Sequence, residues 1–481
     1  MTVADLLTIL PMLVVVIWAV LLMLADLWIP KDRKGITAIL AALGLAVALG
    51  LTLSQGGKTA SAMNGMVVVD GFSVLMDIIF LVSGMAAIAL AYDYLKRMKI
   101  ERGEYYILLL FSISGMMLMA GAFDLIMVFL ALELLSIPLY ILAGFARPRE
   151  ESEESALKYF FLGAFASAFV LYGIALVYGA TSHTDLLKIA QVVSDGTANV
   201  GLFLAGAALV LVGFGFKVAA VPFHRWAPDV YEGAPTPVTG FMSVAVKAAG
   251  FAALLRVFIT AFSSLAVDMT TVLYALAALT MIAGNVLAIA QTNIKRLLAY
   301  SSIANAGYLL MAFVPYGNGQ VLSQTVSSAL FFLVGYGLTS IGAWAVVIAL
   351  EQAEGKGLGL SDFAGLGRKY PWLALAMMIF MLSFTGVPLT LGFWGKFFLF
   401  RTAILGGYTS LALIGLVTSV VSAFYYLKVV VIMYMQPGEP AACEDVWVRF
   451  TAVITAVAVL AFGVIPGPLL NMAAQALLRL Q

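Results

Sequence analysis

The chain has 481 residues, of which 63% are hydrophobic and 11% are charged, and its formal net charge is +1. Soluble domains are only about half apolar, so this composition excludes a water-soluble globular protein. The near-neutral charge gives no reason to expect a nucleic-acid partner. The single cysteine, Cys443, cannot form an internal disulfide and cannot by itself hold an iron–sulfur cluster. We therefore expect an integral membrane protein whose main surroundings are the lipid bilayer.

Apolar stretches of about 20 residues follow one another along the chain, and each can cross a hydrocarbon core about 30 Å thick. They predict an all-α polytopic fold of about fourteen transmembrane helices in one membrane domain, residues 1–481. The first stretch is followed by basic residues rather than by a cleavage site, so we expect it to remain as a span. The predicted spans are 4–29, 35–54, 71–95, 105–122, 124–146, 156–180, 199–230, 236–262, 270–291, 296–315, 321–350, 371–406, 409–434 and 447–470.

Basic residues concentrate on alternate loops between these spans. The loops that share this bias contain Lys31, Arg33 and Lys34; Lys96, Arg97, Lys99 and Arg102; Arg147 and Arg149; Lys295 and Arg296; and Lys356, Arg368 and Lys369. The opposite loops hold little beyond Lys58 and Lys188. Cytoplasmic loops carry the excess of lysine and arginine, so the pattern predicts that both termini lie outside the cytoplasm.

Two predicted spans are longer than a straight crossing requires. Span seven carries Val221 and Pro222, and span twelve carries Gly386 and Pro388, so both helices should be interrupted near mid-depth. Two similarly broken helices, five spans apart and opposite in direction, suggest two inverted five-helix repeats. We expect the first repeat at 104–262 and the inverted second repeat at 270–434.

Four charged residues fall near the middle of predicted spans or beside their breaks. These are Glu133 in span five, Lys217 in span seven, Lys247 in span eight and Lys396 in span twelve. A lysine at that depth costs about 2.5 to 3.5 kcal/mol on insertion scales, so it needs a partner, water or a function. A buried ion pair of Glu133 with Lys217 is one interpretation, although it leaves the other two lysines unexplained. A proton relay across the middle of the bilayer accounts for all four.

Two further residues have open interpretations. His224 lies about two turns from Lys217 and could pass protons between wet cavities, because imidazole titrates near neutral pH. It could equally be a histidine held by hydrogen bonds at a helix break. Lys158, in the first turn of span six, fits a side chain that reaches the cytoplasmic face better than a group for proton uptake. Zinc-ligand spacing, a nucleophile elbow and a nucleotide-binding pattern are absent from the sequence, so we expect no metal or cofactor site.

Several motifs resemble the N subunit of bacterial NADH-quinone oxidoreductase, respiratory complex I. They are HRWAPDVYEGAPTPV at 224–238, SVAVK at 243–247, ELLSIP at 133–138, GVP at 386–388 and GFWGK at 392–396. The resemblance covers essentially the whole chain. The wider antiporter-like superfamily shares the broken span and the lysines, whereas the PDVYEGAP form is similar to subunit N rather than to the L and M subunits.

This resemblance implies a proton-translocating subunit of the membrane arm in a bacterial inner membrane, with K-type and M-type subunits as neighbours and periplasmic termini. NADH, FMN, iron–sulfur clusters and quinone would then belong to partner subunits. It implies Glu133 and Lys217 as the coupling pair, Lys247 as the central relay and Lys396 as the exit-side group. The residues themselves add His224 as an assistant when Lys217 passes its proton to Lys247. The alternatives are a subunit of a multi-subunit sodium/proton antiporter and a structural scaffold that moves no protons.

Overall fold

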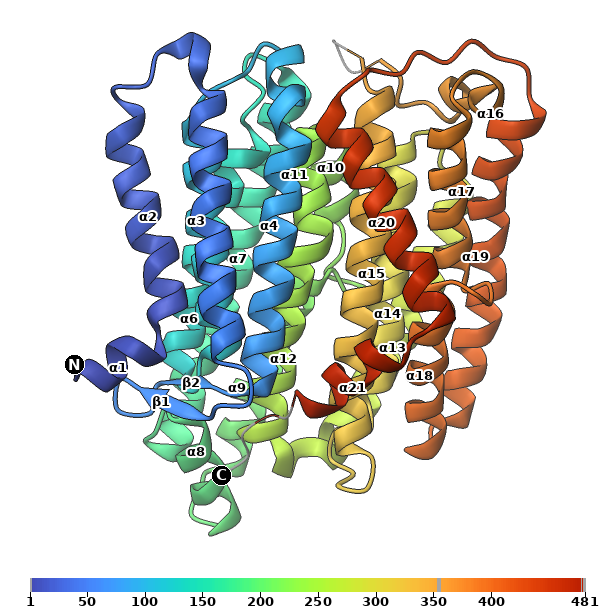
Figure 1. Cartoon of the computed structure of the whole chain (residues 1–481). Coiled ribbons are helices and arrows are strands. Elements are labelled where there is room, and N and C mark those ends of the chain that lie inside the picture. The colour runs from blue at the N-terminus through green and yellow to red at the C-terminus, as the bar shows by residue number, and fades with distance from the viewer. Residues whose placement is uncertain (1, 353–355, 477, 479–481) are drawn as a thin grey trace.

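The computed structural model describes residues 2–352, 356–476 and 478, and most of them lie in helices that run side by side (Figure 1). The helices of the first part of the chain are α1 (Val3–Thr8), α2 (Leu10–Asp26), α3 (Gly35–Ser54), α4 (Gly71–Arg97), α5 (Glu104–Gly121), α6 (Leu125–Ala143), α7 (Glu150–Thr181), α8 (Leu186–Ser194), α9 (Val200–Val218), α10 (Trp226–Gly233), α11 (Thr236–Phe241) and α12 (Lys247–Thr260). A π-helical segment, Met242–Val246, joins the last two.

The second part of the chain is also helical. Its helices are α13 (Ala266–Ile289), α14 (Ile294–Phe313), α15 (Leu322–Leu350), α16 (Leu366–Lys369), α17 (Pro371–Thr385), α18 (Leu391–Leu405), α19 (Thr409–Met435), α20 (Val446–Val464) and α21 (Gly467–Gln475). Short 3-10 turns lie at Lys31–Arg33, Ser263–Leu265 and Leu360–Phe363.

The all-α membrane fold predicted from the sequence is confirmed. Among the described residues, 11 helical segments are long and apolar enough to cross a membrane. The three other predicted spans coincide with α2, with α14, and with α17 followed by α18. The limits of the two repeats, 104–262 and 270–434, stay a prediction.

Three features differ from the predicted spans. Strands β1 (Ala60–Ala62) and β2 (Val67–Val69) form an antiparallel hairpin in the loop before α4, with Ala60 opposite Val69. The loop after α7 contains the amphipathic helix α8. The predicted last span at 447–470 ends earlier, at Val464, because Pro466 cannot continue the helix. A separate helix, α21, begins at Gly467.

Both predicted helix breaks are present. Span seven divides into α9 and α10, joined by residues 219–225, and Ala219 takes a left-handed conformation with φ of 59°. Span twelve divides into α17 and α18, joined by residues 386–390, and Gly386 has φ of 90°. A glycine adopts this conformation without steric cost, which explains why the chain turns there.

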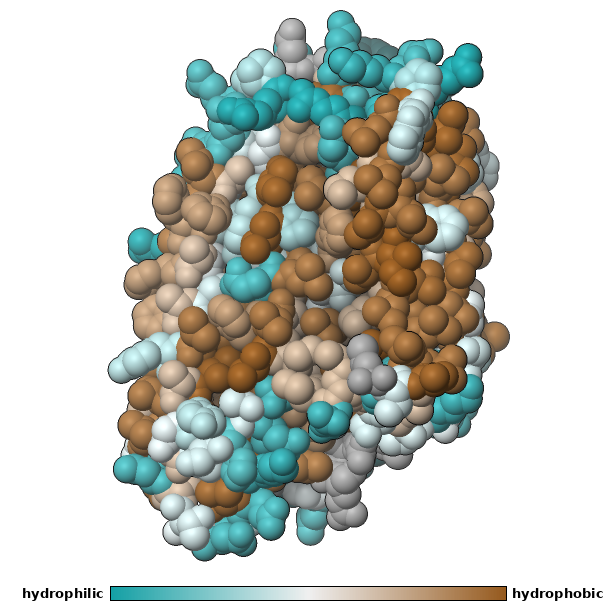
Figure 2. Space-filling view, turned by 90° about the vertical axis from the view of Figure 1, so that its left-hand side faces the viewer, coloured by the Kyte–Doolittle hydropathy of each residue, from teal (hydrophilic) through white to brown (hydrophobic). Residues whose placement is uncertain are grey.

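The most buried span lies in the centre of the molecule. The segment from Thr236 to Thr260 is buried throughout, and it stands between the N-terminal and C-terminal groups of helices (Figure 1). The outer helices expose large apolar side chains, including Ile17, Ile39 and Leu43. Figure 2 shows the resulting surface, with mostly apolar residues between two hydrophilic ends. This distribution fits a protein whose central helices are shielded from lipid and whose flanks face it.

Candidate functional site

The break in span seven places Lys217 at the end of a helix inside the protein. α9 ends one residue later, at Val218, and the left-handed Ala219 closes its last turn. The indole Nε1 of Trp226, at the start of α10, donates a hydrogen bond of 2.8 Å to the carbonyl oxygen of Phe216. The C-terminal end of a helix carries partial negative charge, which favours an ammonium group there.

The ammonium of Lys217 contacts hydroxyl groups rather than a carboxylate. Its Nζ lies 2.6 Å from Ser136 Oγ, to which it donates, and 3.4 Å from the hydroxyl of Tyr159. Glu133, one turn before Ser136 on α6, leaves Oε1 buried without a hydrogen-bond partner in the described structure. No ion pair within 4.0 Å joins Glu133 and Lys217, both of which the structure describes. The pair interpretation therefore does not describe this conformation.

Lys247 follows directly after the π-helical segment Met242–Val246 and is buried at the middle of the central span. Its Nζ donates to both the carbonyl oxygen and the hydroxyl of Ser302 on α14. The ammonium also lies 6.0 Å from the centre of the Tyr336 ring on α15. Single π turns inside α-helices are frequent at functional sites.

Lys396 lies at the second helix break, in the first turns of α18, and is buried. Its Nζ donates to Ser419 Oγ on α19 at 2.8 Å and to the carbonyl oxygen of Thr385 at 3.0 Å. Thr385 is the last residue of α17, so the lysine again contacts the C-terminal end of a broken helix. The Nζ atom of Lys396 lies over the ring of Tyr308, 5.0 Å from the ring centre.

The three buried lysines therefore share one environment, which we call the serine–tyrosine cage. Each ammonium contacts the hydroxyl of a serine on another helix and lies within about 6 Å of a tyrosine ring, a distance at which cations are attracted to aromatic faces. The cages pair Lys217 with Ser136 and Tyr159, Lys247 with Ser302 and Tyr336, and Lys396 with Ser419 and Tyr308. The cage serines and tyrosines were not predicted, because they come from separate helices.

Neighbouring cages are connected by close packing and by a small cavity. Gly250, one turn after Lys247, packs on the aliphatic stem of Lys217, because a Cβ there would lie 3.5 Å from the Cβ and Cγ atoms of the lysine. A cavity of about 10 Å³ borders both Tyr336 and Lys396. Its polar lining also includes Asn305, and this volume is about what one water molecule needs.

His224 lies in the connection between α9 and α10 and is half-buried. Its Nδ1 is buried and has no hydrogen-bond partner in the described structure. Among the described contacts, none joins His224 to Lys217. The two open interpretations of this residue, a proton carrier and a histidine fixed by hydrogen bonds, both remain predictions.

Ion pairs fix α10 to its neighbours. Asp229 pairs with Lys158 of α7 at 2.7 Å and with Arg296 of α14 at 2.9 Å, and Arg296 also reaches Glu232 at 2.7 Å. Lys158 also pairs with Glu154 at 2.7 Å, so its ammonium forms two ion pairs. Its predicted position near the cytoplasmic face stays a prediction. These contacts hold the second half of the broken span against both groups of helices.

A further buried pair was not predicted. Arg256, on the same helix as Lys247, is fully buried and donates two hydrogen bonds of 2.9 Å to the carboxylate of Asp70. Its Nε donates to the carbonyl oxygen of Ala120 at 2.8 Å. The sequence marks Arg256 as a charge in an apolar span, but its partner lies 186 positions away. Among the described residues, no group of histidine, cysteine or acidic side chains is arranged to hold a metal ion.

Comparisons with known proteins identify the family of this chain. Residues 122–422 match the family described as NADH:quinone oxidoreductase/Mrp antiporter, TM. NADH-quinone oxidoreductase subunit N of Chloroflexus aggregans is 45% identical, with 99% of this chain and 98% of the relative covered. A chain of respiratory complex I from Thermus thermophilus superimposes with a TM-score of 0.83 at 38% identity, covering 96% of this chain and 99% of that one. A chain of the Mrp complex from Dietzia sp. DQ12-45-1b has a TM-score of 0.86 at 20% identity, covering 99% and 97%, which shows a shared fold alone.

Proposed function

The chain belongs to the NADH:quinone oxidoreductase/Mrp antiporter family of membrane subunits, and we propose that Lys217, Lys247 and Lys396 carry its proton transport. The chain is a membrane-arm subunit that works with the other subunits of NADH-quinone oxidoreductase and couples quinone reduction to proton movement. The observation that carries the proposal is the serine–tyrosine cage at each buried lysine. NADH, FMN, iron–sulfur clusters and quinone belong to partner subunits.

The cages support a relay because they stabilise a charge without fixing it. A hydroxyl and an aromatic face interact with an ammonium group, but each contributes less than a buried carboxylate would. A lysine held in this way can give up its proton without leaving an unpaired buried anion behind. The relay runs from Lys217 through Lys247 to Lys396, with water in the small cavity beside Tyr336 completing its last part.

Glu133 controls the first lysine in this proposal. Ser136 holds the ammonium of Lys217 at 2.6 Å, while the carboxylate one turn away keeps a buried oxygen unsatisfied. An unsatisfied buried acceptor costs about 1 to 3 kcal/mol, so a small shift of α6 or α9 that brings the two groups together is favourable. The closer position retains the proton on Lys217, and the separated position releases it toward Lys247.

The cytoplasmic side is assigned by the basic loops, so both termini are periplasmic and the relay lies parallel to the bacterial inner membrane. Moving one charge across 100 mV requires about 2.3 kcal/mol. Transport against such a potential needs coupling to quinone reduction elsewhere in the complex. Neighbouring K-type and M-type subunits complete the membrane arm.

The experiment compares Lys217→Ala, Lys247→Ala, Lys396→Ala and Glu133→Ala in assembled enzyme. We expect each variant to lower NADH-driven proton uptake into inverted vesicles, measured with a fluorescent ΔpH indicator. A matched control is Lys188→Ala, which changes a lysine of the loop helix α8 and should have no effect. Normal proton uptake together with normal quinone-linked NADH oxidation in all four variants would contradict the relay and favour a structural scaffold.

The second candidate is a subunit of a sodium/proton antiporter that uses no redox energy. The matched family, described as NADH:quinone oxidoreductase/Mrp antiporter, TM, also includes antiporter subunits, and this observation favours the second candidate. Purification of the tagged chain from its native membrane separates the two functions. Copurification of flavin and iron–sulfur proteins supports the redox-driven subunit, and an assembly that lacks them supports the antiporter.

A further inference from the structure

Two polar side chains of α13 contact the surroundings of two different lysines. Thr280 and Asn285 lie in the second half of this helix, and both are fully buried. A buried polar side chain carries a cost unless its hydrogen bonds are satisfied. The two residues are five positions apart, so their side chains point to different sides of the helix. Each therefore contacts a different part of the protein.

Asn285 has a partner for both polar atoms of its side chain. Its Nδ2 donates to the carbonyl oxygen of Met281 at 2.7 Å and to the hydroxyl of Tyr308 at 3.2 Å. Its Oδ1 accepts from the hydroxyl of Tyr425 at 2.9 Å. Because a carbonyl oxygen can only accept, the contact with Met281 fixes which end of the amide carries the hydrogens. The amide therefore holds a tyrosine of α14 and a tyrosine of α19 in one network.

Tyr308 is the aromatic member of the cage around Lys396. Its ring centre lies 5.0 Å from the lysine Nζ, and its hydroxyl accepts from Asn285. The hydrogen of this hydroxyl can therefore donate toward α19, where the hydroxyl interacts with the side chains of Thr418 and Ser419. Ser419 is the residue that accepts from Lys396 at 2.8 Å. Asn285 thus sets the position of the ring and of the hydroxyl beside the ammonium.

Thr280 contacts the other helix break. Its Oγ1 accepts a hydrogen bond of 2.9 Å from the backbone amide of Val221, in the connection that follows Lys217. The same hydroxyl donates to the carbonyl oxygen of Leu276, so its hydrogen is already used and the oxygen accepts from the break. A helix break leaves backbone amides without helical partners, and such groups are costly inside a protein. Thr280 therefore stabilises the break four residues beyond Lys217.

Two glycines explain how α13 comes close enough to α14 for the first of these contacts. A Cβ on Gly284 would lie 2.6 Å from the backbone nitrogen of Ala304, and a Cβ on Gly307 would lie 2.7 Å from a backbone nitrogen of α13. Small residues let helices in membranes approach closely. Each glycine directly precedes one partner of the hydrogen bond between Asn285 and Tyr308, so the closest packing lies beside that bond.

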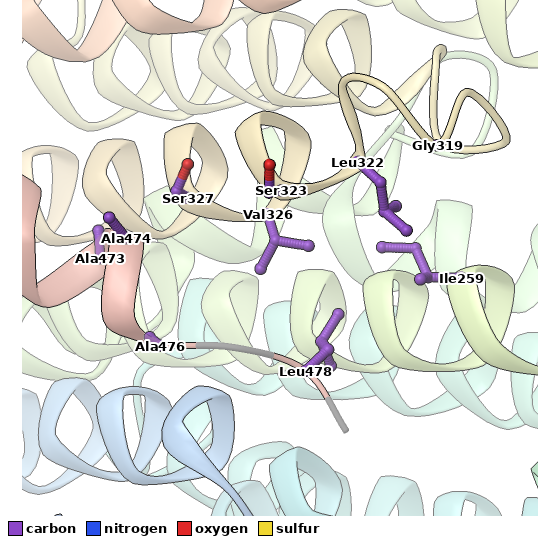
Figure 3. Close-up of a pocket in the computed structure, with 10 residues that line it drawn as sticks. All are labelled: Ile259, Gly319, Leu322, Ser323, Val326, Ser327, Ala473, Ala474, Ala476 and Leu478. Carbon is purple, nitrogen blue, oxygen red and sulfur yellow. The ribbon is translucent and has the colours of Figure 1, made fainter. Parts of the chain in front are cut away.

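A cavity of about 220 Å³ is lined by other residues. Figure 3 shows Ile259, Leu322, Val326 and Leu478 pointing into its centre. Its lining includes none of the three buried lysines and none of their cage residues. Apolar lining of this kind tends to stay dry. The contacts of α13 therefore reach the lysine sites through packed side chains and not through this cavity.

We propose that Asn285 and Thr280 are positioning residues of the proton relay, which act through Tyr308 on Lys396 and through the break of span seven on Lys217. This inference rests on the proposed function. Among the described contacts, neither side chain touches a lysine ammonium, so neither carries the proton itself. One helix thereby fixes the geometry of two lysine sites.

Asn285→Leu tests the first contact, because leucine has a similar branched shape and no polar atom. We expect NADH-driven proton uptake in vesicles to fall about threefold or more, and the pH of half-maximal uptake to shift by about half a unit or more. Tyr308→Phe removes the same hydrogen bond and should shift this pH in the same direction. The double variant should shift it no further than the larger single change, because both remove one contact.

The control for this pair is Gln291→Leu, which also replaces an amide with leucine. Among the described contacts, its Nδ-equivalent group, Nε2, bonds only the carbonyl oxygen of Leu287 four residues earlier. Gln291→Leu should keep the parental uptake and pH dependence. The titratable side chains that border Lys396 or its cavity are Tyr308 and Tyr336, and tyrosines stay protonated near neutral pH. A shift in the pH dependence therefore reports on the lysine.

Thr280→Val tests the second contact, because valine keeps the branched shape of threonine and removes the hydroxyl. We expect uptake to fall about threefold or more, whereas Thr280→Ser, which keeps the hydroxyl, should restore most of it. Thr270→Val is the matched control on the same helix. Among the described contacts, the Thr270 hydroxyl bonds only the carbonyl oxygen of Ala266, so this variant should take up protons like the parent.

All variants are compared at equal amounts of assembled enzyme on native gels. Parental pH dependence in Asn285→Leu, or additive shifts in the double variant with Tyr308→Phe, overturns the role of Asn285. If Asn285→Leu does not assemble, the pH dependence of Tyr308→Phe decides in its place. Parental uptake in Thr280→Val, or equal losses in the valine and serine variants, overturns the role of Thr280.

The lysine variants separate this inference from the proposed function. Loss of uptake in Lys217→Ala and Lys396→Ala, together with parental behaviour of the α13 variants, removes the positioning roles and leaves the relay intact. Normal uptake in both lysine variants removes the relay, and the positioning roles with it.

Discussion

Replacing Arg256 with methionine should destabilise the subunit more than any surface change. The guanidinium and the carboxylate of Asp70 are 1% and 3% exposed, and they share two hydrogen bonds of 2.9 Å. A third hydrogen bond, to Ala120, fixes the end of α5. Arg256→Met keeps most of the side-chain volume but removes the positive charge, so a buried carboxylate loses its guanidinium. Breaking such a pair costs about 3 to 5 kcal/mol.

A double-mutant cycle isolates the interaction between the two charges. Asp70→Asn keeps an oxygen that can accept from the amide of Ser73, an N-cap contact of 2.8 Å, while it removes the negative charge. We expect the Asp70→Asn/Arg256→Met protein to be more stable than the sum of the single changes implies, by about 2 kcal/mol or more. Replacing both members of a buried pair avoids the uncompensated charge that each single change creates.

Unfolding in mixed micelles with increasing dodecyl sulfate measures these free energies, with the loss of helical circular dichroism as the signal. Arg449→Gln is the control, because Arg449 and Glu444 are 42% and 83% exposed and lie 3.2 Å apart. Exposed pairs contribute about 0 to 1 kcal/mol, so this variant should unfold like the parent. If Arg256→Met unfolds within about 1 kcal/mol of the parent, the pair does not anchor α12 and the reasoning is refuted.

Two other changes test the packing and the cages. Ser302→Ala removes the hydroxyl but not the carbonyl that Lys247 contacts, so proton uptake should fall less than in Lys247→Ala. We expect a fall of about tenfold, the lower end of what one hydrogen bond to a charged group contributes, measured as the uptake rate in vesicles. Gly392→Ala should disrupt the second helix break, because its new Cβ would overlap the carbonyl oxygen of Ser383. Gly50→Ala is the control, because no atom lies within 4 Å of a Cβ there. On native gels, the control should assemble normally and Gly392→Ala should not.

The helix breaks were predictable because their causes are local. Pro222 cannot donate to the preceding turn, and Gly386 can adopt a left-handed conformation, so both interruptions follow from a few neighbouring residues. Periodicity and length likewise located the spans. The lysines stood out because charge is rare in apolar segments, although their roles remain proposals.

The surroundings of the lysines were not predictable in the same way. Ser302 and Tyr336 meet Lys247 only after three helices pack together, and serine and tyrosine are common enough in membrane spans to carry no signal alone. Arg256 was a visible signal, a charge in an apolar span, but nothing local identifies Asp70 as its partner. The sequence alone therefore identifies a buried charged residue, whereas the residue that stabilises its charge is known only from the tertiary structure.

The absence of a close carboxylate at the lysines bears on the order of proton movement. In the described structure, none of Lys217, Lys247 and Lys396 has an acidic oxygen within 4.0 Å, so no direct ion pair holds the proton on any of them. Like charges in a low-dielectric interior repel, and the repulsion grows as their separation falls. Under the proposed relay, a proton that arrives at one lysine favours release from the next. Under the same proposal, Glu133 starts this sequence, because its unsatisfied buried oxygen lies one turn before Ser136, the residue that contacts Lys217.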